Sequence, residues 1–252
     1  MVEDDFRKIV KKEAEFQDKK IMTGNRSEYA FFYRDNQEID QYFDQLVKGR
    51  GKLLVLGCSD TKIERFLKKG FKSVVGIDIS QKSLEKINQR IAKKKLNSKV
   101  KVILMDVHSL KFANNAFDLV LGEAILHHLD LKKALPEIYR VLKKRGKIIF
   151  LEPLGMNLIV NWYRKKTPFG RTKFEHPLKI KDFKILEKYF KLQIKGFYLL
   201  TILSFGFKIF LKSDFLYRLS RKILFALDSF LLFFCSYLKY YCWLAVLNGE
   251  KK

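Results

Sequence analysis

Short apolar runs alternate with amphipathic segments through the middle of the chain. Five runs have the length and continuous apolar character of buried strands: KLLVLG (52–57), SVVGIDIS (73–80), KVKVILMD (99–106), FDLVLG (117–122) and GKIIFLEP (146–153). The segments between them predict helices at IERFLKK (63–69), 81–95 and 130–144. Strands that alternate with helices of this length predict βαβ units and a parallel sheet that is covered on both faces.

The flanking segments complete the predicted organisation. Ile39, Phe43 and Leu46 recur at helical spacing within 37–48. After the core, 180–190 predicts an amphipathic helix, 191–200 a sixth strand, and 240–252 a last strand with a polar tail. The predicted parts are therefore an N-terminal helical segment (1–49), an α/β core (50–198), an apolar helical insert (199–239), and the last strand and tail of the core (240–252).

Polar residues stand where the predicted strands end. The first strand ends in the turn Gly57-Cys58-Ser59, and the later strands end at Asp78, Asp106, Glu123 and Glu152. In an open parallel sheet, ligands bind at the carboxyl ends of the strands. A glycine there allows the backbone to approach a ligand, and a carboxylate about 20 residues further on can accept both ribose hydroxyls. The ordered set predicts a nucleotide-binding site between the Gly57 turn and Asp78.

Size and charge narrow the class of partner. The chain has 252 residues, of which 48% are hydrophobic, which is enough for a packed core. Its formal net charge of +24 favours a polyanionic partner, either nucleic acid or an anionic lipid surface. The lysines are spread over the whole chain and form no concentrated arginine and aromatic patch. Nucleic acid is therefore the less favoured partner, and a generally lysine-rich composition explains the charge equally well.

Cysteine usage and the N-terminal sequence indicate the setting. Cys58, Cys235 and Cys242 form neither a metal-binding pattern nor a disulfide framework. The N-terminal sequence MVEDDFRKIVKKEAEF is charged throughout and lacks the apolar core of a signal peptide. A cytoplasmic, reduced setting without a bound metal is therefore expected.

Four successive motifs resemble those of a known family. They are LLVLGCSDT, VVGIDIS, MDVHSLKFANNAFDLVLGEAILHHL and PEIYRVLKKRGKIIFLEP. Over about residues 50–153, their order and spacing are similar to those of class I S-adenosylmethionine-dependent methyltransferases. The resemblance implies an α/β, doubly wound, mostly parallel seven-stranded sheet of the Rossmann-like methyltransferase type, with a reversed last strand. It also implies S-adenosyl-L-methionine as the cofactor and methyl transfer as the reaction.

The resemblance assigns roles to residues at the strand ends. The Gly57 turn would hold the methionine part of the cofactor, the acid after the second strand the ribose, and the pair after the third strand the adenine. Glu123 would face the sulfonium. The cofactor-binding residues implied in this way are Gly57, Cys58, Ser59, Asp78, Ile79, Asp106, Val107 and Glu123.

The first motif departs from the family pattern at three positions. Family members usually have an acid where Val55 stands, and further glycines where Ser59 and Thr61 stand. The missing acid removes an anchor for the amino group of the cofactor, and the added side chains crowd the turn. The alternative to an enzyme is therefore a binding or scaffold relative that has lost its cofactor.

Three histidines are candidates for a general base. An oxygen acceptor needs such a base, and a histidine with a pKa near 6.5 suits proton removal at neutral pH. His127 and His128 follow the fourth strand, and His176 lies in the loop after the fifth. We predict His128 and His176 as catalytic residues. The competing interpretations are a helix contact for His127 and His128, and a helix-entry turn for His176.

The insert before the last strand is unusually apolar. Only Lys208 interrupts the run at 197–211, and only Asp228 the run at 223–238. Because the sixth strand is expected to run parallel to the others, the insert should lie beside the substrate mouth. Apolar faces flanked by basic residues suit an interfacial helix on the inner face of an anionic membrane. A buried cap over an apolar pocket, or a dimer face, is the alternative.

Either interpretation of the insert favours a hydrophobic or lipid-like small-molecule substrate. The alternative functions are an RNA or protein methyltransferase, which only the charge supports, and the inactive binding or scaffold relative.

Overall fold

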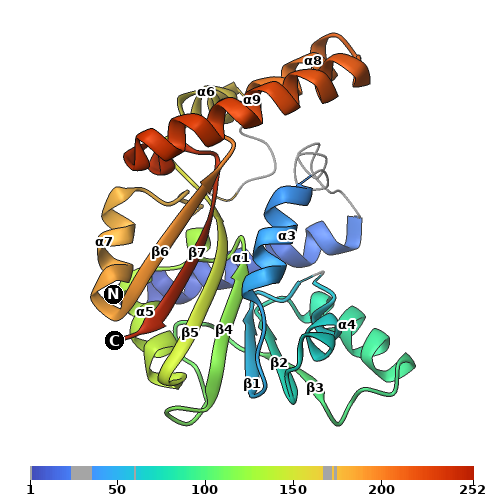
Figure 1. The fold of residues 1–252 in the computed structure, drawn as a ribbon. Coiled ribbons are helices and arrows are strands. Elements are labelled where there is room, and N and C mark those ends of the chain that lie inside the picture. Colours follow the sequence, from blue (N-terminus) through green and yellow to red (C-terminus); the bar gives the residue numbers. More distant parts are fainter. Residues whose placement is uncertain (1, 24–35, 60, 167–171, 173–174) are drawn as a thin grey trace.

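Seven strands form one sheet in the order β3-β2-β1-β4-β5-β7-β6 in the computed structural model, which describes residues 2–23, 36–59, 61–166, 172 and 175–252 (Figure 1). The strands are β1 (Lys52–Leu56), β2 (Ser73–Asp78), β3 (Val100–Leu104), β4 (Phe117–Glu123), β5 (Leu142–Pro153), β6 (Phe190–Phe197) and β7 (Leu244–Lys251). Strands β1 to β5 pair in parallel, whereas β7 runs antiparallel to both β5 and β6. The expected doubly wound sheet with a reversed last strand is therefore confirmed.

Helices connect these strands and extend beyond them. The α-helices are α1 (Val2–Thr23), α3 (Gln37–Leu46), α4 (Gln81–Lys93), α5 (Leu131–Val141), α6 (Leu158–Lys166), α7 (Ile180–Tyr189), α8 (Ser204–Phe210) and α9 (Asp214–Phe234). Short 3₁₀ helices are η1 (Ile63–Lys69), η2 (Leu126–His128), η3 (Thr201–Leu203) and η4 (Ser236–Tyr241). No helix in the described parts of the chain is long and apolar enough to cross a membrane.

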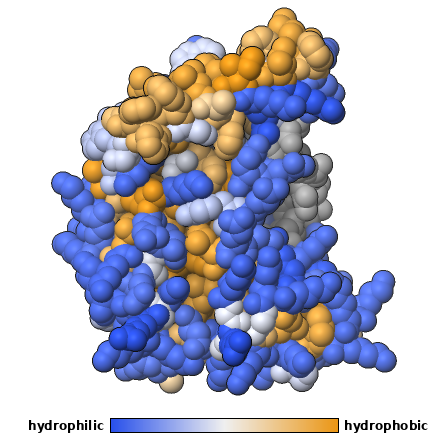
Figure 2. All heavy atoms as spheres, in the orientation of Figure 1, coloured by the Kyte–Doolittle hydropathy of each residue, from blue (hydrophilic) through white to orange (hydrophobic). Residues whose placement is uncertain are grey.

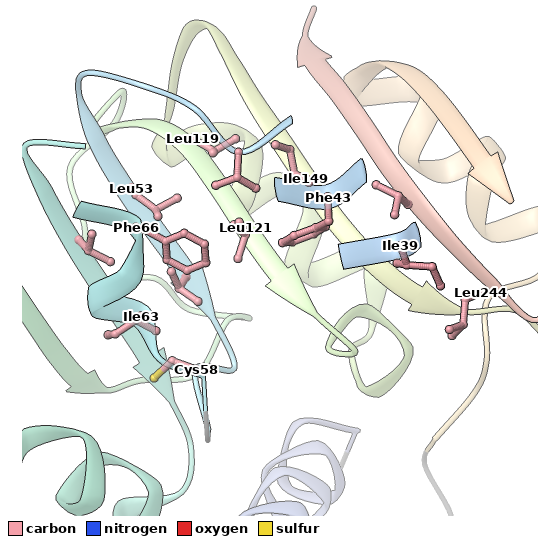
Figure 3. Packing of buried hydrophobic residues seen from close by; sticks show 14 of the residues in the cluster. Ile39, Phe43, Leu53, Cys58, Ile63, Phe66, Leu119, Leu121, Ile149 and Leu244 are labelled. Atoms are coloured by element: carbon pink, nitrogen blue, oxygen red, sulfur yellow. The ribbon is translucent and has the colours of Figure 1, made fainter. Parts of the chain in front are cut away.

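The alternating side chains of the strands build a hydrophobic core on each face of the sheet. Leu53 and Val55 of β1 point into one core, together with apolar residues of α3, η1 and α4. Leu54 and Leu56 point into the other, with residues of α5 and α7. Figure 3 shows part of the first core. The valine that replaces the acid of the family pattern therefore lies within packed apolar residues.

The helix predicted at 63–69 has the predicted bounds and is the 3₁₀ helix η1, after which Gly70 has φ of +96°. Two other predicted boundaries were wrong. The predicted helix 130–144 ends at Val141, because Leu142 already pairs with Phe117 in the sheet. The last strand begins at Leu244 and not at residue 240, because Leu244 lies opposite the last residues of both β5 and β6. The predicted N-terminal helical segment (1–49) includes residues 24–35, which lie outside the described residues.

The insert between β6 and β7 is helical and lies across one end of the sheet, at the top of Figure 1. Asp228 of α9 fastens it to the end of β6. Its carboxylate accepts hydrogen bonds from the backbone N–H groups of Leu199 (2.9 Å), Leu200 (2.7 Å) and Thr201 (3.1 Å). The Thr201 hydroxyl also donates to this carboxylate (2.7 Å), so a buried aspartate with three backbone donors and one side-chain donor ties α9 to the sheet.

Candidate functional site

A cavity of about 630 Å³ opens at the carboxyl ends of β1, β2 and β4, where the strand order reverses. This is the place where open α/β sheets bind their ligands, and the volume is within the usual range for small-molecule sites. Of the residues predicted to bind cofactor, those that line the cavity are Gly57, Ser59, Asp78, Ile79, Asp106, Val107 and Glu123. The strand ends that are far apart in the sequence therefore meet at one site.

The turn after β1 is tightly packed. Gly57 has φ of +60°, and a Cβ atom there would lie 2.8 Å from Cδ1 of Ile125, so a side chain would be both strained and crowded. The prediction for Cys58 was wrong, because its side chain is fully buried in the core and does not line the cavity. That burial also raises the pKa of the thiol. The Cys58 thiol is therefore part of the hydrophobic core and not of the ligand-binding site.

Asp78 holds this turn in place from the end of β2. Its Oδ2 accepts a hydrogen bond from the N–H of Ser59 (2.7 Å), and its Oδ1 accepts one from the N–H of Ser80 (2.8 Å). Burial raises the pKa of Asp78, while these two backbone hydrogen bonds act in the opposite direction. The carboxylate therefore both faces the cavity and fixes the backbone of the loop opposite.

Ser59 is held in a backbone conformation that favours glycine. Its φ is +25°, a backbone conformation that residues with a Cβ atom adopt only at a cost in conformational energy. The loop that follows is braced from α4, where Nη2 of Arg90 donates to the carbonyl of Thr61 (2.7 Å) and Nε donates to Glu64 (3.1 Å). The turn thus keeps the shape that glycines usually provide, although two of the expected glycines are absent.

Asp106 is fixed by the histidine two residues further on. Its Oδ1 accepts from the N–H of His108 (3.0 Å) and lies 2.6 Å from Nδ1 of the same residue. Nε2 of His108 accepts from the N–H of Asp130 (3.0 Å), so the ring proton is on Nδ1 and points to Asp106. Burial would raise the pKa of Asp106, but the hydrogen bonds from His108 hold that pKa below its usual range. A carboxylate is therefore kept at the end of the third strand.

Glu123 is the last residue of β4 and lines the cavity. Its Oε1 pairs with Nη2 of Arg65 at 2.9 Å. Burial raises the pKa of Glu123, and the guanidinium of Arg65 opposes that shift. The carboxyl group therefore lies beside the cavity and forms an ion pair with Arg65 of η1.

The two adjacent histidines lie in the wall of the cavity. Nδ1 of His127 is 2.8 Å from Oε2 of Glu152, whose Oε1 accepts from the N–H of Ile125 (2.9 Å) and of Leu126 (2.8 Å). The ring of His128 packs against that of His127, with centroids 4.2 Å apart. Burial lowers the pKa of His127 to about 4. Burial and the neighbouring His127 together lower the pKa of His128 to about 4. Both rings are therefore neutral at pH 7.

His176 does not share this position. It is exposed and does not line the cavity. Its backbone N–H donates to the carbonyl of His127 (2.8 Å), which places its neighbour Glu175 in the cavity wall. His127, His128 and Glu175 offer potential metal-binding atoms within 4.8 Å of one another. The sequence shows no such cluster because the glutamate comes from a distant loop.

Helix α1 also lines the cavity, which the sequence analysis did not predict. Ile9, Val10, Glu13 and Phe16 face it from consecutive turns of the helix. Asp18 fastens the helix, because its Oδ1 accepts from Oγ of Ser80 (2.5 Å), the N-cap of α4. The helical spacing of these cavity residues was a signal for one buried face. Nothing in the sequence indicated which part of the protein that face would cover.

The remaining wall of the cavity is mostly apolar, although Arg164 of α6 also lines it. Most of it comes from helices α6 and α8, from η3 and from the residue before β7, at Ile159, Val160, Trp162, Ile202, Leu203, Phe205, Ile209, Phe210 and Trp243. The cavity therefore has a polar side at the strand ends and an apolar side beneath the insert.

A family model described as a methyltransferase domain matches residues 54–150. This part of the chain is therefore similar to methyltransferase domains, in agreement with the resemblance to class I S-adenosylmethionine-dependent methyltransferases.

Among curated proteins, the demethylmenaquinone methyltransferase of Bacteroides fragilis is 31% identical over 113 residues, which cover 44% of this chain and 43% of the relative. The chain thus spans less than half of the length of that relative.

Solved structures share the fold. Geranyl diphosphate C-methyltransferase from Streptomyces coelicolor, in complex with S-adenosyl-L-homocysteine, superposes with a TM-score of 0.59 at 12% identity, covering 93% of this chain and 83% of that one. Phosphoethanolamine N-methyltransferase 2 of Haemonchus contortus, in complex with S-adenosyl-L-methionine, superposes with a TM-score of 0.56 at 19% identity, covering 86% of this chain and 52% of that one. At such low identity the likeness concerns the fold, which agrees with the arrangement of strands described above.

The strained turn predicts a stabilising substitution. Replacing Ser59 with glycine removes a backbone strain of about 1–2 kcal/mol, and the greater freedom of glycine in the unfolded chain returns about 0.5–1 kcal/mol. We expect Ser59→Gly to raise the free energy of unfolding by about 0.5–1 kcal/mol in urea titrations. Ser59→Ala keeps the Cβ atom and is the matched control. A glycine variant no more stable than the alanine variant would contradict the strain.

The lowered pKa of His128 predicts a dependence of stability on pH. The folded-state pKa of about 4 lies below the ordinary 6.5, so protons bind the unfolded chain first as the pH falls. The contribution of His128 to the unfolding free energy therefore falls progressively as the pH drops from 6.5 to 4. Glutamine does not titrate, so the variant lacks this loss. Relative to pH 8, the difference in unfolding free energy should move in favour of His128→Gln by up to about 3 kcal/mol. A difference that is independent of pH would refute the lowered pKa.

Proposed function

We propose that this chain transfers a methyl group from S-adenosyl-L-methionine to a hydrophobic or lipid-like small molecule. The observation that carries the proposal is the division of the cavity into two sides. Polar groups gather at the ends of the parallel strands, and apolar side chains line the opposite wall. A polar, charged cofactor and an apolar acceptor would each find a matching surface there.

The residues at the strand ends fit the cofactor. Gly57 lines the cavity, and its φ of +60° gives the turn a conformation that glycine adopts readily. Asp78 would receive the ribose hydroxyls, and Asp106 with Val107 would receive the adenine. When bound, S-adenosyl-L-methionine would supply an activated methyl carbon. What the protein adds is alignment of the acceptor with that carbon and exclusion of water by α1 and the insert.

The neutral histidines suit an acceptor that loses a proton. Both are unprotonated at neutral pH because burial lowers each pKa to about 4. His128 lies 3.4 Å from Glu13, measured from Nδ1 to Oε1, and both residues line the cavity. The Nδ1 atom of His128 is buried and has no hydrogen-bond partner among the residues that the structure describes. We therefore assign to His128 the role of accepting the proton of the acceptor.

The alternative functions are supported by fewer observations. Only the overall charge of +24 supports an RNA or protein acceptor. The scaffold alternative rests on Val55, Ser59 and Thr61, but the turn keeps its shape through Asp78 and Arg90. The names of the relatives, demethylmenaquinone and geranyl diphosphate methyltransferase, agree with a small-molecule acceptor.

Calorimetric titration with S-adenosyl-L-methionine tests the cofactor. We expect saturable binding to the wild type, and at least about tenfold weaker binding to Asp78→Ala. The reason is that one hydrogen bond to a charged group contributes about 1.5–3 kcal/mol. Glu85→Ala removes the same charge from the exposed side of α4 and should bind as the wild type does. Absence of heat for the wild type at high cofactor concentration would leave the scaffold as the better function.

The role of His128 predicts a loss of turnover without a loss of cofactor affinity. His128→Gln should reduce kcat about 10²-fold or more, as removal of a general base does, and should leave the calorimetric Kd for the cofactor unchanged. Treatment of the wild type with a chelator should have no effect on kcat. If the chelator abolished turnover and a divalent cation restored it, the cluster of His127, His128 and Glu175 would be a metal site and the base would be wrongly assigned.

A further inference from the structure

Helix α9 has its polarity reversed. A helix on the surface of a globular protein buries its apolar face and exposes its polar one. In α9 the buried residues are Tyr217 and Asp228. Phe225 and Leu232 pack against the cores, but most of the large apolar side chains of α9 are exposed, for example Phe233 at 82%, Phe215 at 73% and Ile223 at 60%. The helix is therefore built for apolar surroundings on the side that faces away from the sheet.

The inward face of α9 explains why it can point that way. Asp228 accepts three backbone hydrogen bonds at the end of β6. Arg221 binds both oxygens of Glu38 in α3, at 2.9 and 2.6 Å. Polar contacts thus fix the orientation of the helix, so the exposure of its apolar side does not result from a loosely placed element.

The exposed apolar residues form one continuous band, which we call the apolar ridge. Along α9 they recur every three or four residues, as expected for one face of a helix. The ridge consists of Phe210, Leu211, Phe215, Leu216, Leu219, Ile223, Leu227, Phe230, Phe233 and Phe234. Figure 2 shows a hydrophobic surface over α9 at the top of the molecule. A ridge of this length marks a site of interaction.

The ridge continues into the mouth of the cavity. Phe210 and Ile209 of α8, and Trp162 of α6, line the cavity and are also exposed, at 79%, 44% and 60%. The same apolar surface therefore leads from the outside of α9 to the apolar wall of the cavity. Whatever covers the ridge also covers the entrance.

Charge distinguishes between a lipid surface and a second copy of the chain. Lys212, Arg218 and Lys222 are exposed beside the ridge, and the chain as a whole carries +24. Two copies that met at this ridge would bring these cations together. An anionic headgroup layer would neutralise them, while the acyl boundary would receive the phenylalanines.

We propose that the apolar ridge docks into the interfacial layer of an anionic membrane, with α9 parallel to the surface and the cavity mouth open to the lipid. The docking rests on the ridge and on the exposed cations beside it, and it does not depend on the proposed function. The further consequence, that the methyl acceptor enters from the lipid phase, rests on the proposed function.

Flotation with phospholipid vesicles tests the docking. We expect the wild type to float with phosphatidylcholine vesicles that contain phosphatidylglycerol, and less with phosphatidylcholine alone. Ile223→Asp should reduce the partition coefficient by at least about tenfold, because an apolar side chain loses its burial. Leu104→Asp is the matched control, since Leu104 is 56% exposed on β3, away from the ridge. It should float as the wild type does, and circular dichroism should show that both variants are folded.

The charge component has its own test. Lys222→Glu should reduce flotation with the anionic vesicles and leave that with phosphatidylcholine unchanged. High salt should have the same effect on the wild type, because salt screens charges at a surface. Equal loss for Lys222→Glu on both kinds of vesicle would remove the basis for choosing an anionic surface.

Two results would overturn the docking. One is that the wild type fails to float, or that Leu104→Asp loses as much as Ile223→Asp. The other is a lipid-free dimer in analytical ultracentrifugation that Ile223→Asp dissociates, without binding to vesicles, which would assign the ridge to a second copy. Calorimetry with the cofactor separates this failure from failure of the proposed function. A protein that binds cofactor and does not float would retain the methyltransferase assignment, whereas one that floats without binding cofactor would retain only the docking.

Discussion

The bond between the Asp78 carboxylate and the backbone of the Gly57 turn is the contact on which the site depends. It joins the ends of two adjacent parallel strands, and it defines the polar side of the cavity. In a parallel sheet such strand ends are close by construction, but the loops that follow them have no regular partners. A carboxylate that accepts backbone N–H groups supplies these partners. This explains how the turn keeps its shape with a serine at a position that suits glycine.

The protein satisfies opposite requirements on the two sides of its cavity. The strand ends hold carboxylates that are partly stabilised by backbone and histidine donors, so that a polar ligand meets oriented groups. The opposite wall comes from α1, α6 and α8. It is mostly apolar, so it provides contact area but few directional hydrogen bonds. The sheet thus provides the groups that orient a bound ligand, and the added helices provide the surface that selects which apolar molecule fits. Under the proposed function, the acceptor preference would change through the helices while the sheet stays the same.

The core of the fold was predictable because its signals are local. Each central strand is a short apolar run with a polar residue at its end, and the order of these runs specifies the sheet. The rest depends on contacts between distant residues. His127 and Glu152 are 25 positions apart, and no pattern in either segment indicates that they pair. The packing of α1 over the cavity, and the side of α9 that faces outward, likewise follow from tertiary contacts. Cys58 shows that even a local signal can mislead. Its neighbours Gly57 and Ser59 line the cavity, but the Cys58 side chain points in the other direction, into the core.

Asp228 has a consequence for how this surface can vary. It grips backbone N–H groups at Leu199 and Leu200 and does not depend on what their side chains are. Residues in that segment can therefore be replaced without loosening the helix, as long as the chain keeps its path and the Thr201 hydroxyl remains available (Oγ1 to Oδ2 2.7 Å). The attachment of the insert is thus largely independent of its sequence, and related proteins can exchange the residues around the entrance while α9 stays in place.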